Sequence, residues 1–160
     1  MPYPKTVHRT ITIAAPPSAV WQAITDPDQM HEWRDPQKAS TVTAEWRTGG
    51  PIVFEGTWDR RKYLDRGTIL AFDPPSVFRY NFWSRLSRLP DLPENYTVVT
   101  FTLTPAADDR ATTLNLTHTN FQNEAIYGHA NFYWVTALDR LRKFVEARAN
   151  LLSPPPPTNP

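Results

Sequence analysis

The sequence predicts an α+β fold in which a curved antiparallel sheet of about seven strands wraps a long C-terminal helix. Three observations lead to this prediction. About seven short runs have the character of strands, and turn signals separate them. Two short helical patterns follow the first run. The chain then ends in a long apolar stripe at helical spacing, the only predicted element large enough to cover one face of the sheet.

The first strand is expected over residues 6–14, where isoleucines alternate with threonines. Two prolines follow, and proline is tolerated at a helix start because its missing N–H would have no partner there. We therefore expect a helix over residues 19–24. A second short helix is expected over residues 29–33, with Asp26 as its N-cap, and the sequence RDP from Arg34 ends it.

Six further strands are expected over residues 40–46, 52–58, 68–72, 77–84, 96–104 and 111–119. The sequence TGGP after the first of these indicates a hairpin turn, DRRK separates the second from the third, and DPPS precedes the fourth. The alternation is clearest where Val99, Phe101 and Leu103 share one face. These runs follow one another without long interruptions, which favours an antiparallel meander.

The last element is a helix over residues 124–151, bent or broken near Gly128. Trp134, Leu138, Leu141 and Val145 form its apolar stripe. At ~1.5 Å per residue this helix would be about 40 Å long, enough to cross a small sheet. We expect one domain over residues 1–152, followed by a proline-rich tail over residues 153–160 that is disordered or extended.

Composition excludes several classes of function. The net charge of +1, without a local basic run, gives no electrostatic case for binding nucleic acid. The chain has no cysteine, and therefore no disulfide and no thiolate metal site. It shows no signal peptide and no apolar run long enough to span a membrane, so we expect a cytoplasmic protein. Its 12% of aromatic residues suit a large core or an apolar pocket wall.

Four stretches resemble the START-like, Bet v 1-like (SRPBCC) superfamily, in particular bacterial relatives of the Hsp90 ATPase activator and polyketide cyclase-like proteins. They are ITIAAPPSAVWQAITDPDQMHEWRDP, GTILAFDPPSVFRYNF, VVTFTLTPAADDRATTLNLTHTNF and YWVTALDRLRKFVEARA. Together they extend over about residues 6–148, and their order carries the resemblance. The resemblance implies a helix-grip fold with an apolar cavity between sheet and helix. It implies no single activity, because the superfamily includes carriers, cyclases, hydrolase-like members and co-chaperone domains.

His118 is the first candidate for a functional residue. On the strand expected over residues 111–119 it shares a face with Leu114 and Leu116, so it should point into the interior. A near-neutral imidazole there could bind a ligand or transfer a proton as a catalytic group. The pattern favours the alternative, a structural imidazole that is hydrogen-bonded to a neighbouring backbone group.

Aromatic side chains form the second candidate set. Most of them should point inward: Trp33, Trp46, Phe54, Trp58, Phe78, Tyr80, Phe82, Phe101 and Trp134. Core packing explains the majority, but a subset would line any cavity. Strand parity is ambiguous for Trp46 and Trp58. All of these residues except Trp46 join His118 as candidate ligand-binding residues. The Tyr80 hydroxyl would supply a polar group in an apolar wall.

Other motifs indicate little chemistry. The four histidines lack the spacing of metal ligands, and no nucleophile elbow, phosphate loop or dinucleotide fingerprint is present, so we expect neither a metal nor a cofactor. Five charged residues are expected to face solvent: Glu55, Asp59, Arg60, Arg61 and Arg79. The connection over residues 85–95 is placed at a cavity mouth, as a lid or an interface, or is a plain surface loop.

The leading functional hypothesis is that a small hydrophobic or aromatic molecule binds in the cavity. One alternative is a cyclase, dehydratase or hydrolase-like enzyme acting there by acid–base or positional catalysis. Another is an interaction module resembling the Hsp90 activator. It is the least favoured, since the sequence carries no second domain of the kind found in that co-chaperone. Whether the protein forms a homodimer is left open.

Overall fold

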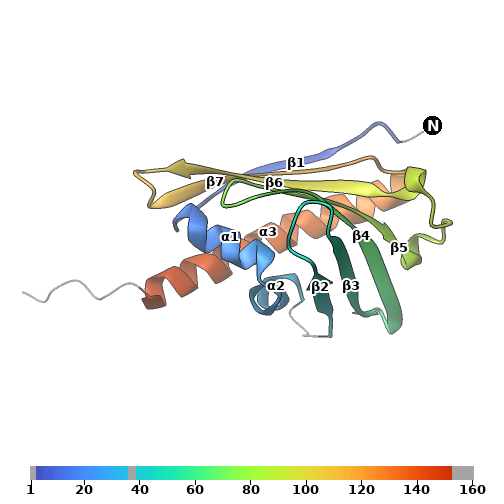
Figure 1. The fold of residues 1–160 in the computed structure, drawn as a ribbon, viewed down its shortest axis with the longest axis horizontal. Helices are drawn as coiled ribbons and strands as arrows, with labels where there is room; N and C mark the ends of the chain where they lie inside the picture. Colours follow the sequence, from blue (N-terminus) through green and yellow to red (C-terminus); the bar gives the residue numbers. More distant parts are fainter. Residues whose placement is uncertain (1–2, 36–38, 153–160) are drawn as a thin grey trace, which may run out of the picture.

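The computed structural model describes residues 3–35 and 39–152, and it has the predicted α+β helix-grip architecture (Figure 1). The elements are β1 (Val7–Ile13), α1 (Pro17–Thr25), α2 (Pro27–Arg34), β2 (Thr41–Ala44), β3 (Pro51–Trp58), β4 (Arg61–Asp73), β5 (Val77–Ser84), the 3-10 turns η1 (Arg85–Ser87) and η2 (Pro93–Asn95), β6 (Thr97–Ala106), β7 (Ala111–Thr119) and α3 (Glu124–Leu152). The tail predicted over residues 153–160 lies outside the described residues.

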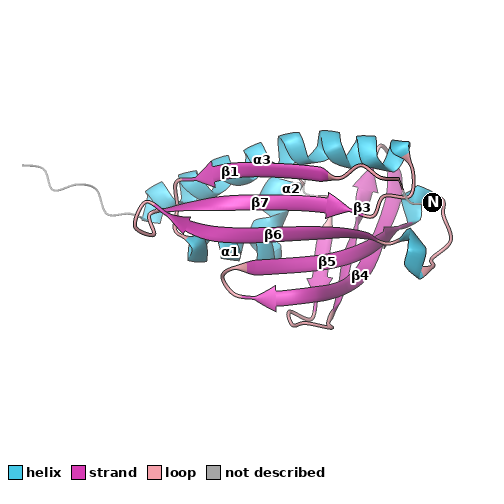
Figure 2. Ribbon diagram, turned by 90° about the horizontal axis from the view of Figure 1, so that it is seen from above, coloured by secondary structure: helices cyan, strands magenta, loops and turns pink. Residues whose placement is uncertain are grey.

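The seven strands form one antiparallel sheet in the order β1-β7-β6-β5-β4-β3-β2. Only the pairing of β1 with β7 joins strands that are distant in sequence. Figure 1 shows the sheet curling from β1, β7 and β6 toward β2 and β3, and Figure 2 shows α3 running along the sheet. The short helices α1 and α2 lie beside α3. Its closest approaches are to β1, α1 and α2.

A close approach between β4 and β5 requires glycine at position 67. A Cβ on Gly67 would lie 1.7 Å from the carbonyl oxygen of Asn81, far inside any permitted contact. The next backbone N–H, that of Thr68, donates to Asn81 Oδ1 at 2.8 Å. The register between the strands then shifts between Ile69 and Ala71. Such a bulge increases the local twist of a sheet and so contributes to its curl.

Both short helices begin two residues earlier than predicted, but the predicted N-cap of α2 is confirmed. Asp26 caps α2, because its carboxylate accepts from the Asp28 N–H at 3.1 Å, and Pro27 occupies the first helical position. The Trp33 indole donates to the Ala23 carbonyl at 2.8 Å, which joins α2 to α1. Helix α3 runs through Gly128 without a break, so the break considered at that residue is wrong.

The predicted bounds of β4 are wrong. We expected a strand over residues 68–72 after a charged connection, but β4 begins at Arg61. A two-residue turn joins β3 to β4, with Asp59 and Arg60 at φ of 48° and 64°, as the tightest hairpin turns require. The first half of β4 went unpredicted because it lacks apolar alternation.

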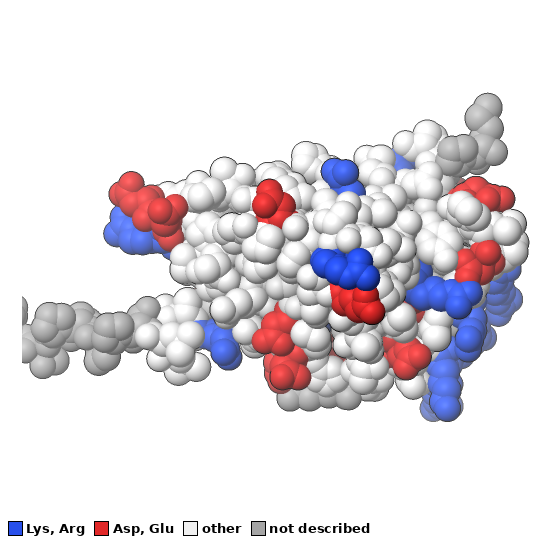
Figure 3. Space-filling model, in the orientation of Figure 1, with Lys and Arg blue, Asp and Glu red and all other residues white. Residues whose placement is uncertain are grey.

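Charged side chains lie on the outside. The five charged residues predicted to face solvent, Glu55, Asp59, Arg60, Arg61 and Arg79, are all exposed. Acidic and basic groups are mixed over the face drawn in Figure 3, as the net charge of +1 suggests. Within the described residues, no helix combines the length and the apolar character that crossing a bilayer demands.

The core fills one end of the space between sheet and helices. Phe78 on β5 stacks on Phe101 of β6, with ring centres 6.2 Å apart, and meets Trp21 of α1 edge-on. Leu138 and Leu141 of α3 are also fully buried. The predicted stripe of α3 is therefore a core stripe along most of its length, and only its N-terminal part borders open space.

Candidate ligand-binding cavity

A cavity of about 510 Å³ lies between the curled part of the sheet and the N-terminal part of α3. Residues from α2, β2, β3, β4, β5, η1, β7 and α3 line it. Its volume falls in the range of small-molecule sites, which are concave, mostly apolar and furnished with a few polar groups. Within the described residues, no group of three or more His, Asp or Glu side chains is arranged to hold a metal ion.

The structure divides the nine candidate ligand-binding residues in two. Six line the cavity: Phe54, Trp58, Tyr80, Phe82, His118 and Trp134. The other three, Trp33, Phe78 and Phe101, are buried in the core and are not among the lining residues. Alternation correctly placed Phe78 and Phe101 on the inner face, but their position along the strand decides whether packed helices or the cavity lie opposite.

Trp46 and Trp58 occupy contrasting positions. Trp46, whose orientation was ambiguous, packs on Phe72 and Phe78 at 6.3 and 5.8 Å between ring centres, away from the cavity. Trp58, at the end of β3, is 54% exposed and meets the His129 ring of α3 edge-on at 5.4 Å. The contact between Trp58 and His129 therefore joins the β3–β4 hairpin to α3 at the rim of the cavity.

His118 points inward, as predicted, and both of its ring nitrogens have partners. The Trp134 indole N–H donates to Nδ1 at 3.1 Å, so the proton resides on Nε2, which lies 2.8 Å from the Thr97 hydroxyl and donates to it. Burial, with the nearby Arg34 charge, lowers the pKa of His118 to about 3. The imidazole is therefore neutral and joins β7, β6 and α3, through side chains rather than the backbone group we had considered.

Arg34 is the main polar group that the sequence analysis missed. Its guanidinium carbon lies 4.6 Å from the centre of the Phe54 ring. Further rings surround it at 5.6 to 6.0 Å, those of Trp33, Tyr133 and Trp134. Its Nη1 donates to the Tyr80 hydroxyl at 3.4 Å, a long hydrogen bond. Within the described residues, no carboxylate lies within ion-pair distance of this cation.

Asp65 is a second unexpected group in the wall. It lies on β4 opposite Phe54, and its Oδ1 is buried without a hydrogen-bond partner among the described residues. Burial raises the pKa of Asp65 to about 6, although a hydrogen bond to Ser84 and the Arg34 charge act in the opposite direction. Burial also raises the pKa of Tyr63, two residues before it. This part of the cavity is consequently polar.

Helical spacing could have identified Arg34. Met30 and Trp33 are apolar and buried, and residues at i, i+3 and i+4 share one face of a helix. Arg34 completes that series, so it faces the interior although its sequence context indicated a helix end. Tyr63 and Asp65 gave no comparable signal, because alternating polar residues do not distinguish an inward face from an outward one.

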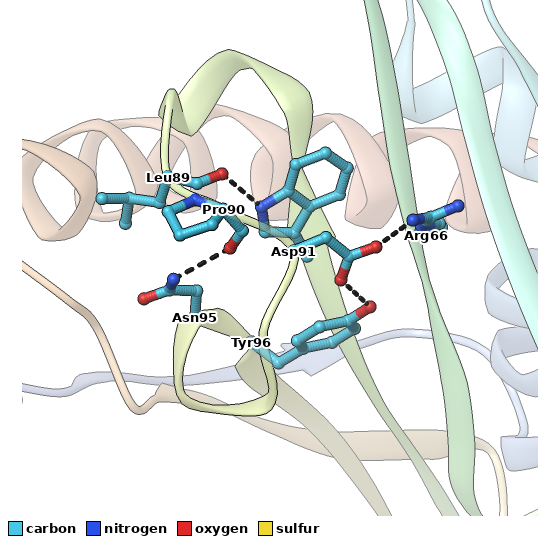
Figure 4. A network of polar contacts seen from close by, with 7 residues as sticks. Arg66, Leu89, Pro90, Asp91, Asn95 and Tyr96 are labelled. Atoms are coloured by element: carbon cyan, nitrogen blue, oxygen red, sulfur yellow. Dashed lines mark hydrogen bonds and ion pairs between the residues drawn. The ribbon is translucent and has the colours of Figure 1, made fainter.

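The connection over residues 85–95 reaches the cavity, where Leu86, Ser87 and Asn95 are lining residues. A network of polar contacts fixes this connection to the sheet (Figure 4). The Asp91 carboxylate pairs with Arg66 of β4 and accepts from the Tyr96 hydroxyl at 2.5 Å. The hydrogen bond from Tyr96, together with Arg66, lowers the pKa of Asp91.

Two further hydrogen bonds hold the same connection. The Trp83 indole donates to the Leu89 carbonyl at 3.0 Å, and the Asn95 amide donates to the Pro90 carbonyl at 2.9 Å. The first bond ties Leu89 to β5, the second joins two residues within the connection, and Asp91 ties the connection to β4. It forms a fixed part of the cavity's edge.

The family model for "Activator of Hsp90 ATPase homolog 1-like protein" matches residues 14–146, which is most of the chain. The chain belongs to this family. A protein from Cytophaga hutchinsonii, solved in solution, is 35% identical, with a TM-score of 0.76 over 94% of this chain and 99% of its own. The predicted resemblance is thereby confirmed at the level of the family.

Two more distant structures share the fold of this Hsp90 activator-like domain. CalU16 from Micromonospora echinospora is 22% identical, with a TM-score of 0.64 over 89% of this chain and 77% of its own. The Aha1 dimer from Colwellia psychrerythraea is 19% identical, with a TM-score of 0.68 over 89% and 96%. A search of curated proteins found no significant match.

Proposed function

We propose that this Hsp90 activator-like domain binds a small aromatic or hydrophobic molecule in its cavity. The observation that carries the proposal is a cavity of about 510 Å³ whose wall combines aromatic rings with the guanidinium of Arg34, which forms no ion pair with any described residue. Apolar walls supply burial, and a few polar groups fix the orientation of a ligand. The aromatic rings that would contact it include those of Phe54, Phe82 and Trp134.

The test uses N-phenyl-1-naphthylamine, an uncharged aromatic dye whose fluorescence rises in apolar surroundings. The dye should bind the wild-type protein saturably, with one molecule per chain. Ala130 is buried on α3 and lines the cavity, so Ala130→Leu places extra methyl groups in the space that the dye needs. If the added methyl groups cost the bound dye the ~1–3 kcal/mol that is typical of overpacking, its affinity should fall by about fivefold to about 150-fold.

The matched control is Ala147→Leu, at an exposed position of the same helix away from the cavity. It should bind the dye as the wild type does. Thermal unfolding of both variants shows whether the fold is kept. The proposal fails if the wild type does not bind the dye, or if a folded Ala130→Leu protein binds it undiminished.

An enzymatic role in the same cavity is the second candidate. Of the titratable groups in the wall, Asp65 has a pKa of about 6, which suits proton transfer near neutral pH. His118, the catalytic candidate from sequence, has a pKa near 3 and engaged nitrogens. Asp65 is therefore the leading acid–base candidate, and turnover of a bound ligand that survives Asp65→Asn would refute this role for Asp65.

A chaperone partner is a separate proposal, suggested only by the family's description. A pull-down with Hsp90 and an assay of the chaperone's ATPase test it. Stimulation of the ATPase by the purified protein would support the proposal, and absence of binding in the pull-down would refute it.

A further inference from the structure

The cavity places one cation in an aromatic wall. Among the described lining residues, Arg34 is the only arginine or lysine, and no described residue forms an ion pair with it. Its hydrogen bond to Tyr80 is long at 3.4 Å, and a guanidinium carries five N–H donors. The other side-chain nitrogens of Arg34 are not among the buried atoms that lack a partner. Their N–H donors are therefore open to the cavity.

The carboxyl groups of the wall do not neutralise this cation. Asp35 accepts a hydrogen bond from the Ala39 backbone N–H at 2.5 Å. Asp65 has its Oδ1 buried without a hydrogen-bond partner among the described residues, and the ion pairs within that part of the chain include none between Arg34 and either carboxylate. The cation is thus held in place by rings and left without the bidentate acceptor for which its planar fork is suited.

A cationic ligand would fit this arrangement poorly. Aromatic faces attract cations, but the Phe54 face is already covered by Arg34 at 4.6 Å. A second cation would have to approach the first within the same wall. An anion would instead complete a charge-assisted pair in surroundings of low polarity, where such pairs are strong.

We propose that the ligand is an aromatic acid, whose rings lie against the aromatic wall and whose anionic group pairs with Arg34. The inference rests on the proposed binding function and adds the charge class of the ligand. The Tyr80 hydroxyl, which accepts from Arg34, is free to donate its own proton to the same anionic group. Asp65 opposes the anion when it is ionised, so its neutral amide variant should bind the acid more tightly.

A pair of dyes with the same ring skeleton tests the charge class. 8-Anilinonaphthalene-1-sulfonate carries an acidic group, and N-phenyl-1-naphthylamine lacks it. Their dissociation constants are measured on the wild type and on Arg34→Met, which keeps an apolar stem but removes the charge. A change in the shape of the cavity should affect both dyes alike, so the ratio of the two dissociation constants isolates the effect of the charge.

In the wild type the sulfonate dye should bind about tenfold to a hundredfold more tightly than the neutral dye, as a charge-assisted pair predicts. Arg34→Met should abolish that preference and change the affinity for the neutral dye by less than about threefold. Arg34→Lys should keep part of the preference, and Asp65→Asn should increase it. Thermal unfolding of every variant, with Arg34→Gln as a second neutral replacement, shows which remain folded.

The two proposals fail in different ways. If the neutral dye binds but the sulfonate dye is not preferred, or its preference survives in folded Arg34→Met, the ligand is not an aromatic acid and binding in the cavity still stands. If neither dye binds the wild type, both proposals are overturned.

Discussion

His118 lies where the sequence predicts, but its hydrogen bonds do not suit the catalytic role considered for it. It points inward on the same face of β7 as Leu114 and Leu116, but Trp134 and Thr97 occupy both ring nitrogens. A base needs a free lone pair, and here the Nδ1 lone pair accepts from an indole. The imidazole consequently acts as a polar joint between the sheet and α3.

The buried imidazole predicts a specific pH dependence of stability. Its pKa is about 3 in the folded protein and about 6.5 in the unfolded chain, so the unfolded chain binds the extra proton between these values. The contribution of the neutral His118 side chain to stability is therefore fully present above pH 6.5. It is lost as the pH drops toward 3, by up to about 1.4 kcal/mol per pH unit. Urea unfolding of wild type and His118→Gln between pH 7.5 and 4.5 measures this slope.

The His118→Gln variant should be less stable at pH 7.5, yet its stability should change less on acidification. His8→Gln, at an exposed position on β1, serves as the control and should retain the wild-type slope. Equal slopes for wild type and His118→Gln would show that His118 does not titrate in this way.

At the scale of elements, the connection over residues 85–95 is the part of the cavity edge that depends most on polar contacts. Asp91 accepts from Tyr96 and pairs with Arg66, so it ties the connection to β4 and to the residue that precedes β6. We expect Asp91→Asn to increase hydrogen exchange of backbone amides over residues 85–95 while the thermal midpoint changes little.

Glu94→Gln is the matched control, because Glu94 is an exposed acid in the same connection. Hydrogen exchange measured by mass spectrometry should distinguish the two variants. Identical protection in Asp91→Asn and wild type would mean that the network of Figure 4 does not hold the connection in place.

Most elements could be predicted because their apolar residues repeat with the period of a strand or a helix. The predicted strand over residues 111–119 coincides with β7, and the predicted terminal helix agrees with α3 to within one residue. The first half of β4 was missed because its inward residues, Tyr63 and Asp65, are polar. Predictions from local sequence patterns are expected to fail at functional positions, and the two residues behind this missed prediction line the cavity.

The candidate site could be predicted only in part for a related reason. Alternation gives the side of a sheet on which a residue lies, but not what packs against that side. Phe78 and Phe82 lie on the same face of β5, yet only Phe82 lines the cavity. The boundary between core and cavity depends on where the helices contact the sheet, which involves residues distant in sequence.

At the scale of the whole molecule, that boundary predicts different effects for two similar substitutions. Phe78→Ala removes a fully buried ring and should cost ~3–5 kcal/mol of unfolding free energy. Phe82→Ala removes a partly buried ring beside open space, so it should cost less stability and weaken dye binding more. Urea unfolding and fluorescence titration of both variants measure these effects, and a larger loss of stability in Phe82→Ala would contradict the placement of the boundary.

Oligomeric state also belongs to this scale. The Colwellia relative was solved as a dimer. Whether this chain forms a homodimer is still an open question, which analytical ultracentrifugation can test.

The measurement that tests the central claim most directly is a ¹⁵N–¹H spectrum of the indole N–H groups during titration with N-phenyl-1-naphthylamine. Trp134 lines the cavity and donates to His118, whereas Trp33 donates to Ala23 in the core. Binding in the cavity predicts a saturable shift of the Trp134 signal and little change at Trp33. An unmoved Trp134 signal, or shifts confined to exposed tryptophans, would contradict the claim that the cavity is the binding site.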